Sequence, residues 1–440
     1  MTEKEFVEFK NSYVGIFSTN YLFQGISNSL FAVIVPIYIL LLFSEKGRGI
    51  NSSELAFLAS IVMLPWAIKL FFGILGDKYG SKKLGRRRPW IIGSAVLSGV
   101  LWIFIPFFIT VENAILLFTI SGVFINVGVA FGDTILDGLI LDICPKKQLG
   151  RTQGFCWGFK SIGAIAGGPV LAFIVVTIRI INVESIFIIY GVLTIISSLL
   201  TLLVNEPKEY PEVMIKKHVK AMFTQSKDWK AYFFALFNAV ADGVVMLFLS
   251  IYILIQMNLI NLKGTSISLE KTNLNIYLYQ ANITLIVSVG IIIGAILGGV
   301  ISDLISRKIG VYLSLIVTTI ALLLILLDTE IIILLIFAGI IGVGLGWRHS
   351  SYSAVVGEMS KQHPEMDSTY FSICNSFANL GNSIGLAITG IIFVLTGGSY
   401  AFIFFFIAMI QNLGVIPFLL LDPKDYEFKI TKGEAIRDIK

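Results

Sequence analysis

Six charged residues stand inside long apolar stretches of this sequence. They are three cations and three acids: Lys69, Lys160, Arg348, Asp133, Asp137 and Asp242. An ionised side chain inside a lipid-embedded segment is costly unless it pairs or faces water. Each of the six is therefore a candidate for binding a solute or carrying a proton. Two further acids, Asp142 and Glu358, lie near the ends of such stretches.

The spacing of three of these residues predicts an ion pair. Lys69 lies eight residues before Asp77, and Asp133 lies nine residues before Asp142. At a rise of ~1.5 Å per residue, both lie on the order of 12–14 Å from the same end of their helices. Asp133 and Asp137 are four residues apart and share a helix face. Lys69 is therefore expected to pair with Asp133 or Asp137, and the pair is either purely structural or part of proton coupling or substrate binding.

A second charged group is expected where the sequence repeats itself. The position that corresponds to Asp133 in the second half of the chain is occupied by Arg348, which precedes His349. One half thus offers acids where the other offers a cation and an imidazole. Together they could bind a zwitterion or an anion, or exchange partners during transport. His349 is either a proton carrier, given its ordinary pKa, or a hydrogen-bonding residue between helices.

Polar stripes mark further helix faces. The stripe residues taken as candidates for the solute path are Asn20, Gln24, Asn238, Asp242, Asn375 and Asn379. Asn20 and Gln24 are one helical turn apart, and Asn238 and Asp242 occupy the corresponding positions in the second half of the chain. The alternative is that these side chains make hydrogen bonds that hold neighbouring helices together.

Twelve apolar segments must position these side chains. They are expected at 18–43, 54–76, 90–110, 114–141, 153–177, 186–204, 230–258, 277–301, 310–327, 331–357, 367–396 and 400–421. Each is near the ~20 residues that a membrane-spanning helix needs. With 56% hydrophobic and 14% charged residues and a mean hydropathy of +0.86, the chain is too apolar for a soluble domain. The sequence predicts an all-α integral membrane protein with twelve transmembrane helices.

The chain reads as two copies of a six-helix unit. Glu206-Pro-Lys-Glu-Tyr210 returns in the second half as Asp422-Pro-Lys-Asp-Tyr426, each time after an apolar segment. Duplicated units of this size are typical of secondary transporters. We predict an N-terminal bundle over 1–204, a cytoplasmic linker over 205–229, and a C-terminal bundle with a cytoplasmic tail over 230–440.

Lys and Arg are distributed unequally between the two sets of connections. Excluding the N-terminal tail, one side carries 23 and the other carries 5. By the positive-inside rule the richer side is cytoplasmic, so both termini are expected there, in a multi-pass protein of the plasma membrane. This asymmetry explains the net charge of +5 without a nucleic-acid partner. The acidic N-terminus is not read as a signal peptide, and the three cysteines are read as small core residues.

Two connections carry the same motif. Gly73-x-x-x-Asp77 is followed by a basic cluster that includes Arg86, Arg87 and Arg88, and Gly299-x-x-x-Asp303 is followed by Arg307 and Lys308. With Asp142 and Arg151, these charges are expected to hold a cytoplasmic gate shut. A simple positive-inside anchor would explain the arginines but not the repeated spacing.

The duplicated motif resembles the loop motif of the major facilitator superfamily. A narrower resemblance, to the muropeptide permease and acetyl-coenzyme A transporter branch, is carried by Leu64-Pro-Trp-Ala-Ile-Lys69 and by Asp133-x-x-x-Asp137-(x)4-Asp142. In this branch an Arg-Gly pair follows, whereas here Gly150 precedes Arg151. The run from Gly85 to Trp90 also resembles sugar:cation symporters. The resemblance implies alternating access around a site between the halves.

We therefore expect a secondary transporter for a small polar organic solute, such as a sugar, an amino-sugar peptide or an organic anion. It would be a monomer, without a cofactor, and driven by a proton or sodium gradient, most plainly protons through Asp133 or Asp137 with Lys69. A uniporter or exchanger of the same fold is the first alternative. An intramembrane lipid-modifying enzyme is the second, although the sequence has no phosphate-binding loop, zinc-binding motif or nucleophile elbow.

Overall fold

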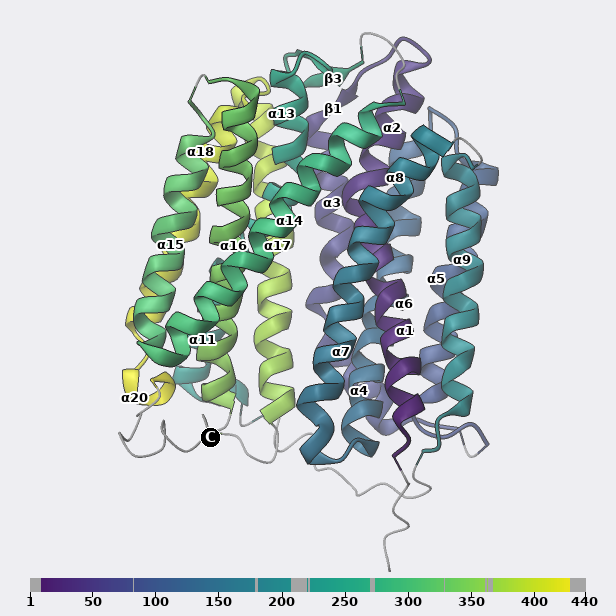
Figure 1. Cartoon of the computed structure of the whole chain (residues 1–440), viewed down its shortest axis with the longest axis vertical. Helices are drawn as coiled ribbons and strands as arrows, with labels where there is room; N and C mark the ends of the chain where they lie inside the picture. The colour runs from purple at the N-terminus through teal and green to yellow at the C-terminus, as the bar shows by residue number, and fades with distance from the viewer. Residues whose placement is uncertain are drawn as a thin grey trace, which may run out of the picture. The chain divides into compact units, whose positions relative to one another are not determined.

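The computed structural model describes residues 9–81, 83–178, 181–206, 220, 222–269, 274–327, 329–360, 362 and 367–427. Within these ranges, the side chains of residues 77, 146–151, 153, 154, 303, 367 and 368 lie outside the description. The described part contains twelve helical stretches that are long and apolar enough to cross a membrane. This confirms the predicted fold class, and most of the predicted segments differ from the observed helices by only a few residues at their ends (Figure 1).

The first six spans are built from these elements: α1 Asn11–Ser29, η1 Leu30–Ile34 and α2 Val35–Ser44; α3 Ser52–Ala67 and α4 Lys69–Lys78; α5 Arg88–Phe108; α6 Ala114–Ile143; α7 Lys146–Ile165, η2 Ala166–Val170, α8 Leu171–Phe173 and η3 Ile174–Ile178; and α9 Val183–Leu199 with η4 Leu200–Leu203.

The last six spans are built from a second set of elements: α11 Ser226–Asn238, α12 Asp242–Val244, η5 Val245–Leu249 and α13 Ser250–Gln256; α14 Ile276–Leu304; α15 Arg307–Leu324; α16 Ile331–Ser360; α17 Asp367–Thr396; and α18 Tyr400–Ile410, η6 Gln411–Gly414 and α19 Val415–Leu419. The short helix α20, Pro423–Tyr426, follows the last span.

Several spans are not continuous α-helices. The second span contains Pro65 and breaks three residues later at Ile68, whose φ and ψ are −103° and 18°. The seventh span breaks between Asn238 and Asp242. Other spans contain π-helical turns, one of which includes Pro169. Broken helices expose main-chain polar groups inside a bundle, and they often surround the binding site of a transporter.

A three-stranded antiparallel sheet of order β1-β3-β2 was not anticipated from the sequence. Its strands are β1 Ile50–Asn51, β2 Asn261–Lys263 and β3 Ser266–Ser268. Strands β2 and β3 form a hairpin around Gly264, whose φ of +61° suits a two-residue turn that begins with glycine. Strands of two or three residues carry too little alternation to be recognised in the sequence.

The contacts divide the chain into two compact units. Unit 1 comprises Met1–Ile215, Gly243–Leu285 and Asn382–Tyr400, and unit 2 comprises Lys216–Asp242, Ile286–Gly381 and Ala401–Lys440. Helices α14 and α17 contribute residues to both. Much of the predicted linker lies outside the described residues, so the division into sequential six-helix bundles stays a prediction.

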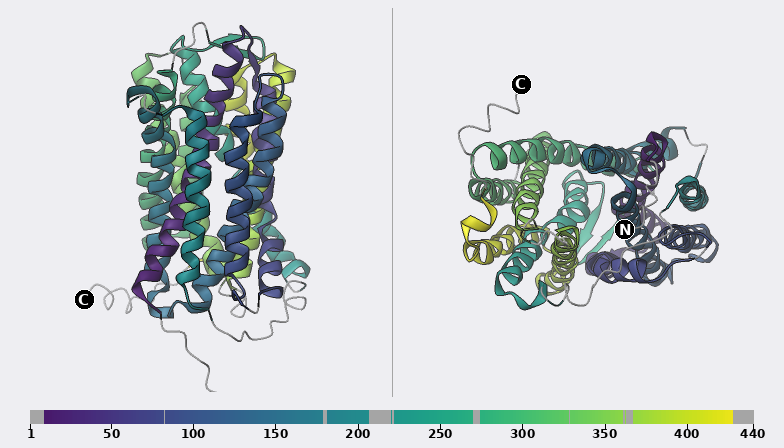
Figure 2. Two further views of the ribbon diagram at one scale, coloured as in Figure 1. Left: turned by 90° about the vertical axis from the view of Figure 1, so that its right-hand side faces the viewer. Right: turned by 90° about the horizontal axis from the view of Figure 1, so that it is seen from below.

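Inside unit 1, α1 and α7 run side by side (Figure 2). The core between α1, α6 and α7 is apolar and includes Phe17, Leu136, Leu139 and Cys156. The candidate charges Asp133 and Asp137 lie on α6 directly beside this core. Burial of this apolar surface fixes the helices that carry the charged side chains.

Candidate transport site

The break in the second span determines where Lys69 lies. Helix α3 ends at Ala67, and Lys69 is the first residue of α4. From this position its ammonium reaches Asp133 on α6, and the two form an ion pair. The predicted pairing of Lys69 with Asp133 is therefore confirmed. The side chains are 15% and 5% exposed, respectively.

Asp133 has a second cationic partner. The Lys160 ammonium on α7 lies 3.3 Å from the other carboxylate oxygen of Asp133, and the Lys160 side chain is 13% exposed. One buried carboxylate thus contacts two ammonium groups from two further helices. Removing it would strand both cations in a site with little water.

Aromatic rings surround the two ammonium groups. Lys160 lies 4.7 Å from the ring centre of Trp157 and 5.3 Å from that of Trp66. Lys69 lies 5.3 Å from the ring centre of Trp66. Trp66 is oriented by its indole N–H, which donates to the Asn126 side-chain oxygen at 2.7 Å. Such cation–π contacts stabilise positive charge where water is scarce.

Asp137 lies one helical turn from Asp133 and accepts a hydrogen bond from the Tyr21 hydroxyl. The Lys160 ammonium also lies 5.6 Å from the ring centre of Tyr21. Tyr21 on α1 therefore touches both the second carboxylate and the second cation. With Lys69, Lys160, Asp133 and Asp137, the group holds two positive and two negative side chains, and we call it the α6 charge cluster.

Two glycines bring α1 and α7 close enough to complete this cluster. A Cβ atom placed on Gly25 would lie 2.0 Å from the main-chain oxygen of Lys160. A Cβ atom on Gly163 would lie 2.0 Å from the main-chain oxygen of Leu22. Any larger residue at either position would push the two helices apart, and Lys160 would move with α7.

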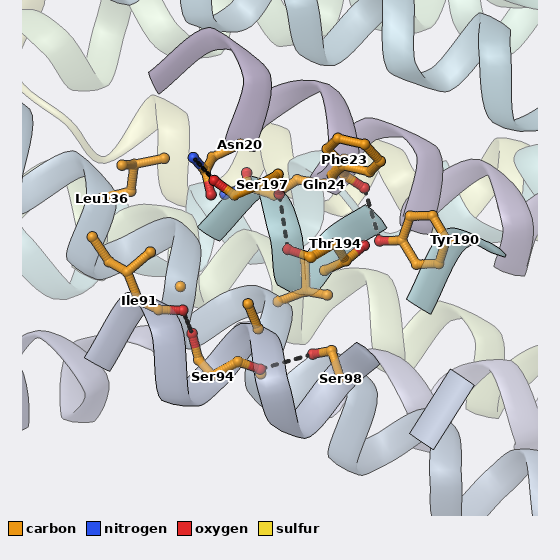
Figure 3. A pocket seen from close by; sticks show the side chains of 14 residues that line it. Asn20, Phe23, Gln24, Ile91, Ser94, Ser98, Leu136, Tyr190, Thr194 and Ser197 are labelled. Carbon is orange, nitrogen blue, oxygen red and sulfur yellow. Dashed lines mark hydrogen bonds between the residues drawn. The ribbon is translucent and has the colours of Figure 1, made fainter. Parts of the chain in front are cut away.

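The predicted residues Asn20 and Gln24 line a cavity of about 40 Å³ between α1, α5, α6 and α9 (Figure 3). Asn20 donates to the Ser197 main-chain oxygen at 3.2 Å. The Gln24 side-chain oxygen has no hydrogen-bond partner among the residues that are described. The cavity has room for a few water molecules. A part in the solute path remains a prediction for both residues.

The second charged group lies in unit 2. Arg348 on α16 is 1% exposed, and its Nη1 donates to the Gln411 side-chain oxygen at 2.7 Å. Gln411 in turn donates to the Thr319 hydroxyl at 3.1 Å. The Nε and Nη2 atoms of Arg348 have no hydrogen-bond partner within the described ranges. This guanidinium therefore donates to a neutral amide, and the Asp242 carboxylate of the same unit acts on it electrostatically.

Asp242 and His349 lie near one another in the same unit. The His349 Nε2 is 3.6 Å from an Asp242 carboxylate oxygen, and the two side chains are 49% and 17% exposed, respectively. Asp242 begins α12, directly after the break in the seventh span, and Asn238 ends α11 before it. The contact is an ion pair only when the imidazole carries a proton.

Asn375 and Asn379 lie one turn apart on α17. The Asn375 side-chain oxygen accepts a hydrogen bond from the Tyr352 hydroxyl at 3.2 Å. Both asparagines are half-buried. Their place in a solute path is untested and stays a prediction.

The predicted gate arginines of unit 1 make two sets of contacts. Arg86 and Arg87 contact the Asp142 carboxylate at 3.1 and 2.9 Å. The Glu206 carboxylate, 1% exposed, lies 3.3 Å from the Arg88 Nε. It also accepts the main-chain N–H groups of Arg86, Arg87 and Arg88 at 2.7, 3.0 and 2.8 Å. Glu206 thus caps the start of α5.

Unit 2 has a similar arrangement, in which Glu358 takes the place of Asp142 and Glu427 takes the place of Glu206. Arg307 contacts the Glu358 carboxylate at 3.0 Å, and Glu358 occupies the position that corresponds to Asp142 in the first half of the chain. The start of α15 is capped by Glu427, which accepts the main-chain N–H groups of Arg307 and Lys308 at 3.2 and 2.9 Å. Burial, followed by the Glu427 charge, raises the pKa of Tyr426 to about 12. The side chains of Asp77, Arg151 and Asp303 lie outside the description.

The comparisons with known proteins agree with this architecture. The sequence model of the Major Facilitator Superfamily matches residues 17–269 and again residues 231–439. The chain belongs to the Major Facilitator Superfamily. This assignment points to a membrane transport protein and not to an enzyme, and it confirms the superfamily resemblance found in the loop motifs.

Curated relatives within the superfamily match only part of the chain. A protein named "Probable folate-biopterin transporter 4", from Arabidopsis thaliana, is 28% identical over 162 residues, 36% of this chain and 32% of the relative. An AmpG-type transporter of Rickettsia felis is 33% identical over 115 residues, 25% of each chain. The chain thus spans about a third or less of the length of these relatives.

Among solved structures, a bacterial homologue of the human lysosomal transporter Spinster, in an inward-facing and occupied conformation, has a TM-score of 0.69. It is 14% identical, and the match covers 96% of this chain and 99% of that one. At this identity the likeness concerns the fold alone. The likeness covers nearly the whole chain.

Proposed function

We propose that this superfamily member is a proton-coupled transporter that moves a small polar organic solute by alternating access. The observation that carries the proposal is the α6 charge cluster, in which Asp133 binds Lys69 and Lys160 beside a helix break. A buried carboxylate with two ammonium partners can exchange them when helices move. We further propose a monomer in the plasma membrane, with both termini cytoplasmic and no cofactor besides the gradient.

Within the cluster, we assign the transported proton to Asp137. The Asp133 carboxylate already contacts two ammonium groups. Asp137 is one turn away on the same helix, so a proton on it relieves the repulsion between the two carboxylates. The Tyr21 hydroxyl, which contacts Asp137, is placed to direct that proton. A change in the α1–α7 contact would then alter the protonation of Asp137.

For the solute, we propose a molecule with an anionic group that Arg348 binds. Arg348 is buried, and two of its donor atoms lack a partner in the described structure. A planar guanidinium with free donors is suited to a carboxylate. The sequence predicts a sugar, an amino-sugar peptide or an organic anion. Among these, the relatives named for folate and biopterin favour an organic anion with a heterocycle. Asp242 and His349 would then adjust the charge of this second site.

A solute screen followed by flux assays tests these proposals. Thermal shifts of purified protein with folate, biopterin, an amino-sugar peptide and a sugar at two pH values identify a ligand. With that ligand, proteoliposomes carrying Asp137→Asn should keep counterflow but lose accumulation driven by a pH gradient. Thr119→Val is the matched control on the same helix, where the Thr119 hydroxyl donates to the Ile115 main-chain oxygen of its own helix, and it should keep accumulation.

Two results would contradict parts of this proposal. Accumulation by Asp133→Asn, Asp137→Asn, Asp242→Asn and His349→Gln under a pH gradient alone would favour a uniporter, an exchanger or sodium coupling. If Arg348→Gln lowers the affinity for neutral biopterin as much as that for anionic folate, Arg348 does not recognise the anionic group.

A further inference from the structure

The small sheet joins loops that come from different repeats. Strand β1 follows the first span, and the β2–β3 hairpin follows the seventh span. Ile50 is paired with Ile267, and Asn51 with Ser266, in antiparallel register. All of these residues belong to unit 1. Figure 1 shows β1 and β3 together beyond the end of α2, away from the start of α1.

Further contacts strengthen this junction. The Ser52 main-chain N–H donates to the Thr265 main-chain oxygen at 2.9 Å. The Leu269 main-chain N–H donates to the Ser44 hydroxyl at 3.1 Å. The paired side chains Ile50 and Ile267 are 0% and 1% exposed. Main-chain pairing with buried side chains makes this a specific contact and not a loose touch between loops.

Beside the sheet, helix α3 also contacts helices of the second half of the chain. The hydroxyls of Ser52 on α3 and Tyr400 on α18 are 2.9 Å apart. Two turns further along α3, the Ser60 hydroxyl donates to the Ser383 main-chain oxygen on α17 at 2.7 Å. This end of unit 1 is therefore closed by contacts between the second span and the eleventh and twelfth spans.

We propose that the β1–β3 pairing is a latch. The two strands must separate before the transport path opens toward the end of unit 1 that carries the sheet. The proposal rests on the alternating access proposed above. Because β1 and β3 belong to different repeats, movement of one repeat against the other must break the pairing or bend its loops. Only two residue pairs join β1 to β3, and the hairpin keeps its own β2–β3 pairs when they part.

Two disulfides that share one cysteine test the latch. Asn51→Cys with Ser266→Cys joins β1 to β3, whereas Lys263→Cys with Ser266→Cys joins only the two strands of the hairpin. Directly opposite residues of antiparallel strands have Cα separations suitable for a disulfide. Peptide masses verify each bond. The reporter is Ser60→Cys, labelled in vesicles by an impermeant maleimide from the side of the sheet, with the protein lacking this change as background.

The latch disulfide should lower the labelling rate of Ser60→Cys at least tenfold, and reduction should restore it. The hairpin disulfide should leave the rate within twofold of that of the unbridged protein. Equal labelling with the latch closed would overturn the latch while leaving alternating access intact. Absence of labelling without either disulfide would overturn both, because this end would then not open.

Discussion

The α6 charge cluster and the Arg348 site lie at corresponding places of a duplicated sequence, yet they satisfy their charges differently. In the first, Asp133 contacts two ammonium groups, and Asp137 accepts from Tyr21. In the second, Arg348 contacts the neutral Gln411 and keeps two donor atoms without a described partner. The first site pairs its charges by direct contact, whereas the Arg348 guanidinium has a neutral contact and only the electrostatic influence of Asp242.

This contrast separates two roles that the sequence alone left joined. In a cluster with equal numbers of positive and negative side chains, binding of a proton can change which ammonium contacts which carboxylate. A buried guanidinium with free donors is unfavourable until an acceptor binds. Coupling is therefore expected at the first site and solute recognition at the second. The following changes test the contrast in order of their expected effect on stability.

Asp133→Asn should have the largest effect. It leaves Lys69 and Lys160 without the carboxylate that both contact, and stranding a buried charge costs about 3–5 kcal/mol. We expect a strong loss of folded protein, measured by thermal unfolding in detergent and by the yield of monodisperse protein.

The double variant Lys69→Met with Asp133→Asn provides the control. It leaves one ammonium, Lys160, and one carboxylate, Asp137, so charge balance returns. Its stability should exceed that of Asp133→Asn alone. If the two effects simply add in a double-mutant cycle, Lys69 and Asp133 are not energetically coupled.

Tyr21→Phe should have the next largest effect, because it removes one hydrogen bond to a carboxylate and retains the ring beside Lys160. The expected loss is about 1.5–3 kcal/mol if Asp137 is charged. Chemical denaturation at two pH values measures it. Phe17→Leu, in the apolar core on the same helix, is a control whose effect should not depend on pH. A loss for Tyr21→Phe that is equally independent of pH would argue against contact with a titrating group.

Glu206→Gln and Glu427→Gln compare the two capping carboxylates. Glu206 caps three N–H groups, is buried and pairs with Arg88, so we expect a loss of about 1–2 kcal/mol. Glu427 caps the N–H groups of Arg307 and Lys308, and we expect a loss below about 1 kcal/mol. Hydrogen exchange at the first turns of α5 and α15 would locate both effects. Equal losses would mean that burial of Glu206 adds nothing.

Arg348→Met should have the smallest effect on stability, within about 1 kcal/mol, because it removes a buried charge whose hydrogen bonds are only partly satisfied. The same variant should lose affinity for the anionic ligand found in the solute screen. Thermal unfolding with and without ligand measures both quantities. A destabilisation as large as that of Asp133→Asn would show that Arg348 has a strong partner in the protein.

Much of the fold was predictable because hydropathy and residue spacing determine membrane-spanning helices directly. The pairing of Lys69 with Asp133 followed from their depth along their helices. Lys160 was recognised as an embedded cation, but its contact with Asp133 depends on how Gly25 and Gly163 bring α1 to α7. The depth of a residue along its helix does not tell which neighbouring helix its side chain faces.

Other parts of the site carried weaker signals. Tyr21 and Trp157 have no distinguishing pattern in the sequence, and only their positions beside the charged groups in the structure show their roles. Gln411 and Asn412 are adjacent amides in an apolar span, and Gln411 could have been recognised there as a partner for Arg348. Glu427 was hidden because the repeated pentapeptide aligns Glu206 with Asp422, whereas the carboxylate that caps α15 comes five residues later.

The position of Glu206 also determines where the first repeat can be cut. By hydropathy the first bundle ends at residue 204, but by its hydrogen bonds it ends at Glu206, which holds the first turn of α5. A half-length protein stopped at 204 would lack this carboxylate and begin its third span with three uncapped N–H groups beside three arginines. Split versions and fusion points in this connection should therefore keep Glu206 with the helices before it.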